Sequence, residues 1–320
     1  MEQYRVSRRF GVWVICLTLL FRVLEVGLPQ KLVGHLRFAS PNIQTDAGRE
    51  ARHFSFSFPI ESAPPAGTEP EPMAFTPEQA ADIPLTNTSA MQPDYGALLA
   101  QPLDWSLTGE QPTVLIVHTH TSESYDPSGG AYVQTGAYRT LDEECNMLSI
   151  GDRLARRLEA EGIGVIHDRE FHDYPSYNSA YASARKSVTA ILKEHPTVRL
   201  VLDLHRDAVE DGGRQLATQA AIGGAESARL MTVLGVGRSG LDNPRWQENL
   251  SLALKLQLTL EAQAPGITRP LSLRPQRFNQ DLASYSLLIE VGAAGDTHAA
   301  ALTAADHLAD ALIALAAGNP

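Results

Sequence analysis

From residue 112 onward, short apolar runs alternate with segments whose apolar residues recur every three or four positions. The runs are typical of buried strands, and the periodic segments of helices that pack one face on a core. Strands are expected at 113–117, 165–166, 198–204, 229–236 and 286–291. Helices are expected from a capping box at Thr140-Leu141-Asp142-Glu143 to about 162, and over 177–192, 246–260 and 297–316. This alternation predicts an α/β fold with a mainly parallel sheet covered by helices on both faces.

The N-terminal segment has the pattern of an export signal or a membrane anchor. Three arginines precede an uninterrupted apolar run over 10–21, and basic residues before such a run are typical of both. Extension to residue 28 gives enough length for a span, but includes Arg22 and Glu25, which lie about one turn apart. We interpret residues 10–28 as an anchor that is kept, in preference to a cleaved signal, and residues 1–9 as a cytoplasmic basic segment.

The stretch between the anchor and the alternating pattern is rich in Pro, Ala, Ser and Glu, notably over 62–72. Such a composition cannot build a core. We therefore expect residues 29–110 to be a low-complexity stalk and residues 111–320 to be the folded domain. The protein is then expected in the cell membrane, as a single-pass protein with its domain outside the cytoplasm.

Composition excludes several other classes of protein. The formal charge of −11 argues against nucleic acid as a partner, because nucleic-acid binding needs a basic face. With two cysteines, neither a disulfide framework nor a metal site built from cysteines is possible. Residues 235–240 match G-x-G-x-x-G, but no acidic residue ends a matching second strand, so a dinucleotide cofactor is not expected.

Two predicted strands end beside candidate metal ligands. His120 and Glu123 follow the first strand in an H-x-x-E spacing, and His205 follows the strand over 198–204. The carboxyl ends of parallel strands are where sites form in such folds. Two His and one Glu with an open fourth position are the ligand set of a hydrolytic zinc site. The sequence therefore predicts zinc held by His120, Glu123 and His205, with Glu143 or Glu144 as alternatives to Glu123.

Three neighbouring residues are expected to support this site or to contact a substrate. Asp203 leaves its strand on the same face as His205 and is suited to orient that imidazole. His118 is interpreted as a supporting residue because the strand is expected to end near residue 117, although an exchange with His120 stays open. Arg206 is expected either to hold a substrate carbonyl or carboxylate or to form a structural ion pair.

Glu290 is the candidate general base, because it stands in the apolar run Leu287-Leu288-Ile289-Glu290-Val291-Gly292. Burial of a carboxylate is costly and raises its pKa, which suits it to take a proton from a water at the metal. A structural salt bridge is the alternative. Together these residues predict a zinc hydrolase.

Four motifs in order along the chain resemble the stage II sporulation protein P family over about residues 112 to 317. They are His118-Thr119-His120-Thr121-Ser122-Glu123-Ser124-Tyr125, Asp203-Leu204-His205-Arg206-Asp207-Ala208, Asn243-Pro244-Arg245-Trp246-Gln247-Glu248-Asn249, and Asn279-Gln280-Asp281-Leu282 with Ile289-Glu290-Val291-Gly292.

This resemblance implies a membrane-anchored cell-wall hydrolase of endospore-forming bacteria, similar to zinc-dependent N-acetylmuramoyl-L-alanine amidases. It implies peptidoglycan as substrate, action during engulfment of the forespore, and a partner lytic transglycosylase with a membrane scaffold. Cleavage of peptide cross-links is a further family trait. Two alternatives stay open: a zinc carboxypeptidase or deacylase of similar site design, and a non-catalytic wall-binding scaffold.

Overall fold

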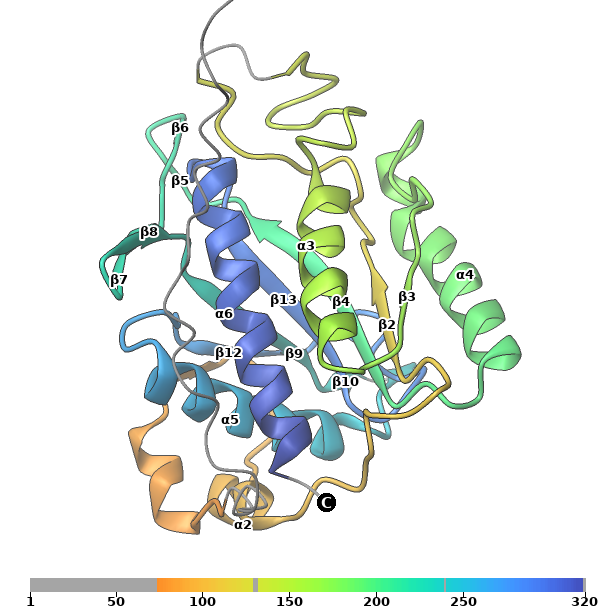
Figure 1. The fold of residues 1–320 in the computed structure, drawn as a ribbon, viewed down its shortest axis with the longest axis vertical. Helices are drawn as coiled ribbons and strands as arrows, with labels where there is room; N and C mark the ends of the chain where they lie inside the picture. The colour runs from red at the N-terminus through yellow and green to blue at the C-terminus, as the bar shows by residue number, and fades with distance from the viewer. Residues whose placement is uncertain (1–73, 129–131, 239, 319–320) are drawn as a thin grey trace, which may run out of the picture. The chain divides into compact units, whose positions relative to one another are not determined.

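A mixed sheet forms the centre of the part of the chain that the structure describes, residues 74–128, 132–238 and 240–318 (Figure 1). In this computed structural model its strands are β1 (Leu85–Asn87), β2 (Val114–Val117), β3 (Val165–His167), β4 (Leu200–Asp207), β9 (Leu230–Gly235), β12 (Leu271–Arg274) and β13 (Ser286–Ala293). They lie in the order β1-β12-β9-β13-β4-β2-β3. Neighbours are parallel except β9 and β13, which confirms a mainly parallel sheet.

Short strands outside this sheet form two-stranded ribbons in the connections. They are β5 (Glu210–Asp211) with β6 (Arg214–Gln215), β7 (Ala220–Ile222) with β8 (Ala225–Ser227), and β10 (Gly237–Arg238) with β11 (Leu241–Asp242). The G-x-G-x-x-G match falls at the end of β9 and in the third ribbon, so no helix follows it directly. This agrees with the expectation that it is not a dinucleotide site.

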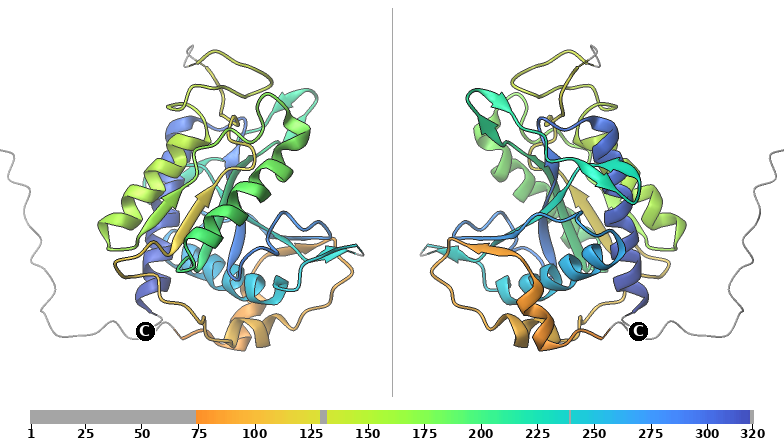
Figure 2. Two further views of the ribbon diagram at one scale, coloured as in Figure 1. Left: turned by 90° about the vertical axis from the view of Figure 1, so that its right-hand side faces the viewer. Right: turned by 90° about the vertical axis from the view of Figure 1, so that its left-hand side faces the viewer.

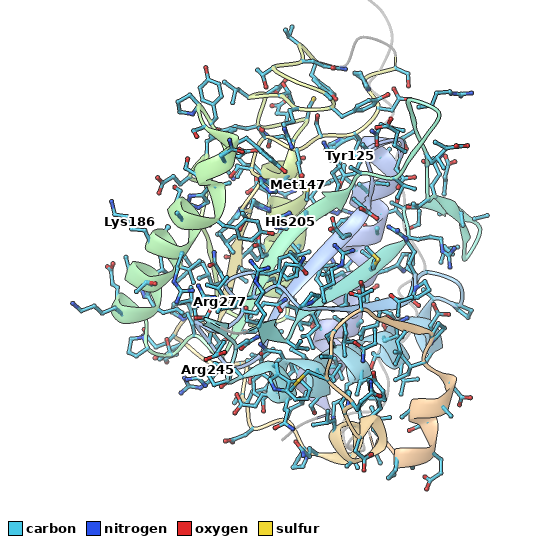
Figure 3. All side chains as sticks on the ribbon, turned by 180° about the vertical axis from the view of Figure 1, so that it is seen from behind. Tyr125, Met147, Lys186, His205, Arg245 and Arg277 are labelled. Carbon is cyan, nitrogen blue, oxygen red and sulfur yellow. The ribbon has the colours of Figure 1, made fainter. Side chains whose placement is uncertain are left out.

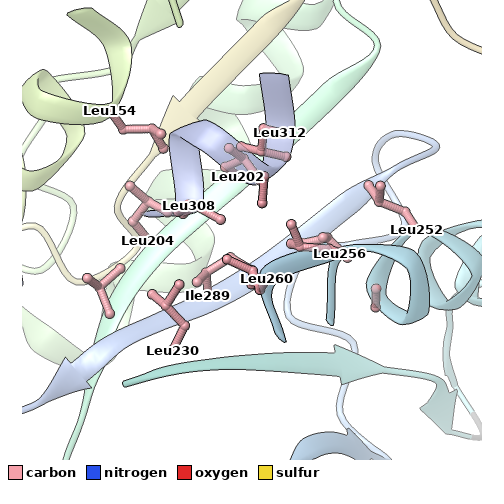
Figure 4. Packing of buried hydrophobic residues seen from close by; sticks show 14 of the residues in the cluster. Leu154, Leu202, Leu204, Leu230, Leu252, Leu256, Leu260, Ile289, Leu308 and Leu312 are labelled. Atoms are coloured by element: carbon pink, nitrogen blue, oxygen red, sulfur yellow. The ribbon is translucent and has the colours of Figure 1, made fainter. Parts of the chain in front are cut away.

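Helices cover both faces of the sheet, as predicted. On one face lie α3 (Met147–Ala160), α5 (Trp246–Gln263) and α6 (His298–Ala317), and on the other lies α4 (Ala180–Glu194) after the short 3₁₀ helix η3 (Tyr177–Ser179) (Figure 2). The larger core cluster joins the first three helices to the sheet. Figure 4 shows Leu308 and Leu312 of α6 beside Leu202 and Leu204 of β4.

α6 is, within the described ranges, the helix long and apolar enough to cross a membrane by length and composition. Half of its apolar window is buried, and its leucines Leu308, Leu312 and Leu315 belong to the core cluster. Its apolar character is therefore explained by packing on the sheet. The predicted anchor over 10–28 and the basic segment over 1–9 lie outside the described residues.

The predicted start of the first long helix is wrong. The capping box at Thr140-Leu141-Asp142-Glu143 lies in a turn, and α3 begins only at Met147, with the Asn146 side chain accepting from the backbone N–H of Leu148. Thr140 instead donates its backbone N–H to the carbonyl of Ser122 and its hydroxyl to that of Val133. The box residues are used to hold a loop, so they do not cap a helix.

The predicted boundary between stalk and domain also differs from the structure. Residues assigned to the stalk form η2 (Pro77–Asp82), the edge strand β1 and the helix α2 (Tyr95–Ala100). Leu98, Leu99, Leu103, Trp105 and Leu107 are all buried in the main core cluster. The domain therefore begins well before residue 111. The Pro-rich part of the predicted stalk, up to residue 73, lies outside the described residues.

One buried lysine ties this N-terminal segment to the rest of the domain. The Lys255 ammonium on α5 donates to the carbonyls of Leu98 (3.5 Å) and Leu99 (2.5 Å) and to the Ser251 hydroxyl (3.1 Å). Carbonyls in the last turn of a helix lack the full set of partners within the helix, and the ammonium gives two of them in α2 a buried hydrogen bond.

Replacing Lys255 with Met should therefore lower the free energy of unfolding by about 1–3 kcal/mol, because buried hydrogen bonds of a charged donor are lost. Urea denaturation followed by circular dichroism measures this change. Lys186→Met is the matched control, because Lys186 is exposed on α4. Equal midpoints for the two variants would contradict the role of Lys255.

Candidate metal centre

Successive side chains of β4 and β13 point to opposite faces of the sheet, and this alternation determines which of them face the site. Leu202 and Leu204 point into the core beneath α3 and α6, so Asp203 and His205 point to the face that carries α4. Glu290 of β13 pairs in parallel register with His205. The two side chains therefore leave neighbouring strands side by side. Figure 3 shows this face of the sheet, with His205 labelled near its middle.

The loop after β2 brings the other two predicted ligands to the same place. One ligand atom from each of His120, Glu123 and His205 lies within 4.8 Å of the others. All three residues are buried, between 4% and 8% exposed. Glu143 and Glu144 are exposed and outside this group, and Glu143 pairs with Arg169 instead. The structure therefore favours Glu123 over the alternatives.

The donor set fits a divalent cation. His120 Nδ1 and Glu290 Oε2 are buried without a hydrogen-bond partner in the described part of the chain, so polar atoms converge on a space that protein groups do not satisfy. The grouped ligand atoms come from two imidazoles and one carboxylate, a donor set that zinc takes when a fourth position is left for water.

Burial shifts the ionisation of the groups in this centre. It raises the pKa of Glu290 to about 8, and the nearby negative charge of Glu123 adds to the rise, against the opposing charge of His205. Burial lowers the pKa of His120. For His205, burial opposes protonation, but the charge and hydrogen bond of Asp203 prevail and raise its pKa to about 10. Metal binding at His205 would therefore release a proton.

Asp203 lies beside His205 on the same strand face. Its Oδ1 lies 2.9 Å from His205 Nε2, which leaves His205 Nδ1 facing Glu123 Oε2 at 3.6 Å. Thr119 donates to both carboxylate oxygens of Asp203, through its backbone N–H (2.8 Å) and its hydroxyl (2.6 Å). A carboxylate fixed on one side and in contact with an imidazole on the other orients the ring of a metal ligand.

Arg206 is committed to the loop that carries Glu123. Its Nε donates to the carbonyl of Ser124 (2.9 Å) and its Nη2 to that of Tyr138 (2.8 Å), while Nη1 lies 3.6 Å from Glu123 Oε1. The backbone N–H of Arg206 also donates to Glu123 Oε2 (3.2 Å). With 5% exposure, Arg206 has the surroundings of a residue that positions Glu123.

Replacing Arg206 with Lys should weaken zinc binding about 10- to 100-fold, the usual effect of losing a group that orients a ligand. A lysine keeps the charge but cannot reach both carbonyls and the carboxylate in one plane. Competition with a fluorescent zinc chelator measures the affinity. Unchanged affinity with reduced hydrolysis would instead indicate that Arg206 contacts the substrate.

His118 lies on the opposite face of the sheet from the predicted ligands His120, Glu123 and His205. Its Nδ1 lies 3.1 Å from the carbonyl of Leu204 and its Nε2 lies 2.8 Å from His167 Nε2. Gly151 of α3 faces this pair, and a Cβ there would come within 2.6 Å of both Nε2 atoms. His118 therefore supports the strand end, which agrees with its interpretation as a supporting residue and argues against an exchange with His120.

Two side chains that hold the centre were not predicted from the sequence. Asp173 accepts from the backbone N–H and the hydroxyl of Ser122, and so fixes the loop between the two ligands. The Tyr177 ring stacks on the His120 imidazole, with ring centroids 4.4 Å apart. Both come from a connection that is distant in sequence from the H-x-x-E motif, and neither belongs to a motif of its own.

A second group of potential ligands, Asp168, Glu170 and His172, is also close enough to share an ion. Both imidazole nitrogens of His172 already contact protein groups, Ser183 Oγ at 3.0 Å and Asp168 Oδ2 at 3.2 Å. Glu170 is exposed. The buried group around His205 is therefore the better metal site.

The chain matches the family model described as Stage II sporulation protein P over residues 39–313. It is 28% identical over 196 residues to the Stage II sporulation protein P of Bacillus subtilis (strain 168), a match that covers 58% of this chain and 46% of that protein. The chain thus matches about half the length of this relative.

Solved structures also resemble the chain. The N-acetylmuramoyl-L-alanine amidase AmiC2 of Nostoc punctiforme is 16% identical with a TM-score of 0.38, covering 66% of this chain and 96% of that one. The CwlD amidase from Clostridioides difficile, in complex with the GerS lipoprotein, is 14% identical with a TM-score of 0.39, covering 64% and 95%. Ami1 from Mycobacterium smegmatis is 17% identical with a TM-score of 0.38, covering 67% and 98%.

Proposed function

The chain belongs to the stage II sporulation protein P family, and from this premise we propose that it is a zinc-dependent peptidoglycan hydrolase. The bond cleaved is the amide between N-acetylmuramic acid and the L-alanine of the stem peptide. The observation that carries the proposal is the buried group of His120, Glu123 and His205 with Glu290 on the neighbouring strand.

His120, Glu123 and His205 would hold the ion, and Asp203 and Arg206 would keep two of these ligands in place. When bound, zinc supplies a Lewis acid that polarises the scissile carbonyl and lowers the pKa of water. Family membership directs this chemistry to peptidoglycan, and the site chemistry is consistent with hydrolysis of an amide.

Glu290 would move the proton in this reaction. Its side chain is buried beside His205, and one carboxylate oxygen is free of protein partners in the described part of the chain. A pKa raised by burial suits a carboxylate that accepts a proton from the attacking water and then delivers it to the leaving amine of L-alanine. The Arg206 guanidinium already donates hydrogen bonds to the loop that carries Glu123. We therefore do not assign Arg206 to stabilise the oxyanion that forms from the scissile carbonyl.

The cellular setting forms part of the same proposal. Residues 10–28 would anchor the protein in the cell membrane with its domain outside the cytoplasm, and cleavage would serve engulfment of the forespore. A lytic transglycosylase and a membrane scaffold would be its partners, and peptide cross-links a second substrate. These statements rest on family membership and on the basic and apolar pattern of the first 28 residues.

The test is to identify the fragments that the purified chain releases from peptidoglycan, by mass spectrometry. An amidase releases whole stem peptides with a free L-alanine amine. Cleavage of cross-links leaves stem peptides attached to the glycan, and a zinc carboxypeptidase releases single terminal residues. If the zinc-loaded, folded chain binds the wall and releases nothing, the proposal fails in favour of a wall-binding scaffold.

A further inference from the structure

His120 and His205 are held in different ways. Asp203 Oδ1 lies 2.9 Å from His205 Nε2, an ion-pair contact, whereas His120 Nδ1 is buried with no hydrogen-bond partner and no ion-pair partner within the described ranges. A histidine that binds metal usually donates its second nitrogen to a carboxylate or carbonyl, which fixes the ring. Some other contact must therefore fix the orientation of His120.

Three rings surround the His120 imidazole. Tyr177 lies parallel to it, with ring centroids 4.4 Å apart and planes 14° apart. Tyr181 and His205 meet it edge-on, with planes 88° apart and centroid distances of 5.7 Å and 5.3 Å. A parallel ring resists tilting of the imidazole, and the edge-on rings limit its rotation in plane.

Tyr177 is itself held from a second element. The guanidinium carbon of Arg139 lies 4.1 Å from the centre of the Tyr177 ring, within the range of a cation–π contact. Among the described residues no acidic group pairs with Arg139. Its loop is fixed to the metal-binding loop by two backbone hydrogen bonds, Thr140 N–H to Ser122 O (2.9 Å) and Ser124 N–H to Tyr138 O (3.0 Å).

We infer that Tyr177, held by Arg139, is the positioning residue for His120 and takes the place of the carboxylate contact that Asp203 makes with His205. The flat face of the ring performs this role, and the hydroxyl is not needed for it. The inference rests on the proposed role of His120 as a metal ligand. It assigns to η3, the short helix before α4, a function in metal binding in addition to its place in the fold.

The experiment compares zinc affinity in Tyr177→Phe and Tyr177→Leu, by competition with a fluorescent chelator. Phe keeps the flat ring, and Leu keeps apolar bulk without it. We expect the Phe variant to bind zinc within about twofold of wild type and the Leu variant about tenfold more weakly, as when an orienting group is lost. Thermal unfolding of the zinc-free variants should match wild type, because Tyr177 is 47% exposed.

Three results would overturn the inference. Equal zinc affinity in all three proteins would show that the stack does not position His120. Equal losses in Phe and Leu would assign the effect to the hydroxyl. An unaltered affinity with slower wall cleavage would make Tyr177 a substrate contact. If the wild-type protein itself binds no zinc, the proposed function is wrong. That result differs from all three above, in which the wild-type protein binds zinc, so failure of the proposed function and failure of the inference about Tyr177 are distinguishable.

Discussion

Replacing Glu290 with Gln should lower peptidoglycan hydrolysis by about 10²- to 10⁴-fold, the usual contribution of a general base, and leave zinc affinity near that of wild type. The amide has the shape of the carboxylate but cannot accept a proton from water. Glu290 is absent from the group of ligand atoms that lie within 4.8 Å of one another, so the ion should remain bound. Released stem peptides and zinc affinity are measured on the same preparation.

Glu159→Gln is the control for this prediction, because Glu159 is exposed on α3 and its loss removes the same charge. It should hydrolyse peptidoglycan at the wild-type rate. Retained activity in Glu290→Gln would show that Glu290 is a structural carboxylate. Loss of both zinc and activity would show that Glu290 is a zinc ligand, and its proposed role as a general base separate from the ligands would be wrong.

Replacing His205 with Ala should weaken zinc binding by more than about 100-fold, beyond the effect of losing a group that only orients a ligand. The change removes one of three protein ligands and leaves Asp203 buried without the imidazole that it contacts. Hydrolysis should fall with zinc occupancy. Chelator competition gives the affinity, and the metal content of the purified variant gives the occupancy.

His195→Ala provides the matched control, since His195 is the partly exposed residue that follows α4 and is outside the ligand group. It should keep wild-type zinc content. If the His205→Ala variant still binds one zinc per chain with wild-type affinity, His205 is not a ligand, and another imidazole must bind the ion.

The grouping of His120, Glu123 and His205 could be predicted because it depends on strand ends, which the sequence marks clearly. Buried runs such as 113–117 and 286–291 identify the strands, and parallel strands bring their carboxyl ends together. The choice between His118 and His120 could be made only from the structure. The pleat continues beyond β2 as far as His118, which therefore faces His167 on the far side of the sheet.

The residues that hold the ligands could not be predicted in the same way. Asp173 and Tyr177 lie more than fifty positions from the loop that they support, in a connection without periodicity or motif. Their contact with the centre depends on how η3 and α4 dock on the sheet. A pattern in one sequence carries no signal for such a long-range contact.

The predicted start of the domain at residue 111 is too late for a related reason. The four residues of β12 and the three of β1 are too short to stand out, and they pair with each other across about 185 positions. The apolar residues of 98–107 fall within the predicted stalk, whose composition is marked by residues 62–72. Their burial against α5 and the sheet places them in the core.

The most direct test of the account is the zinc content of the purified chain, measured together with hydrolysis before and after chelation. We expect one zinc per chain, loss of stem-peptide release when the metal is removed, and recovery when zinc is returned. A folded chain that releases stem peptides equally well without metal would contradict it.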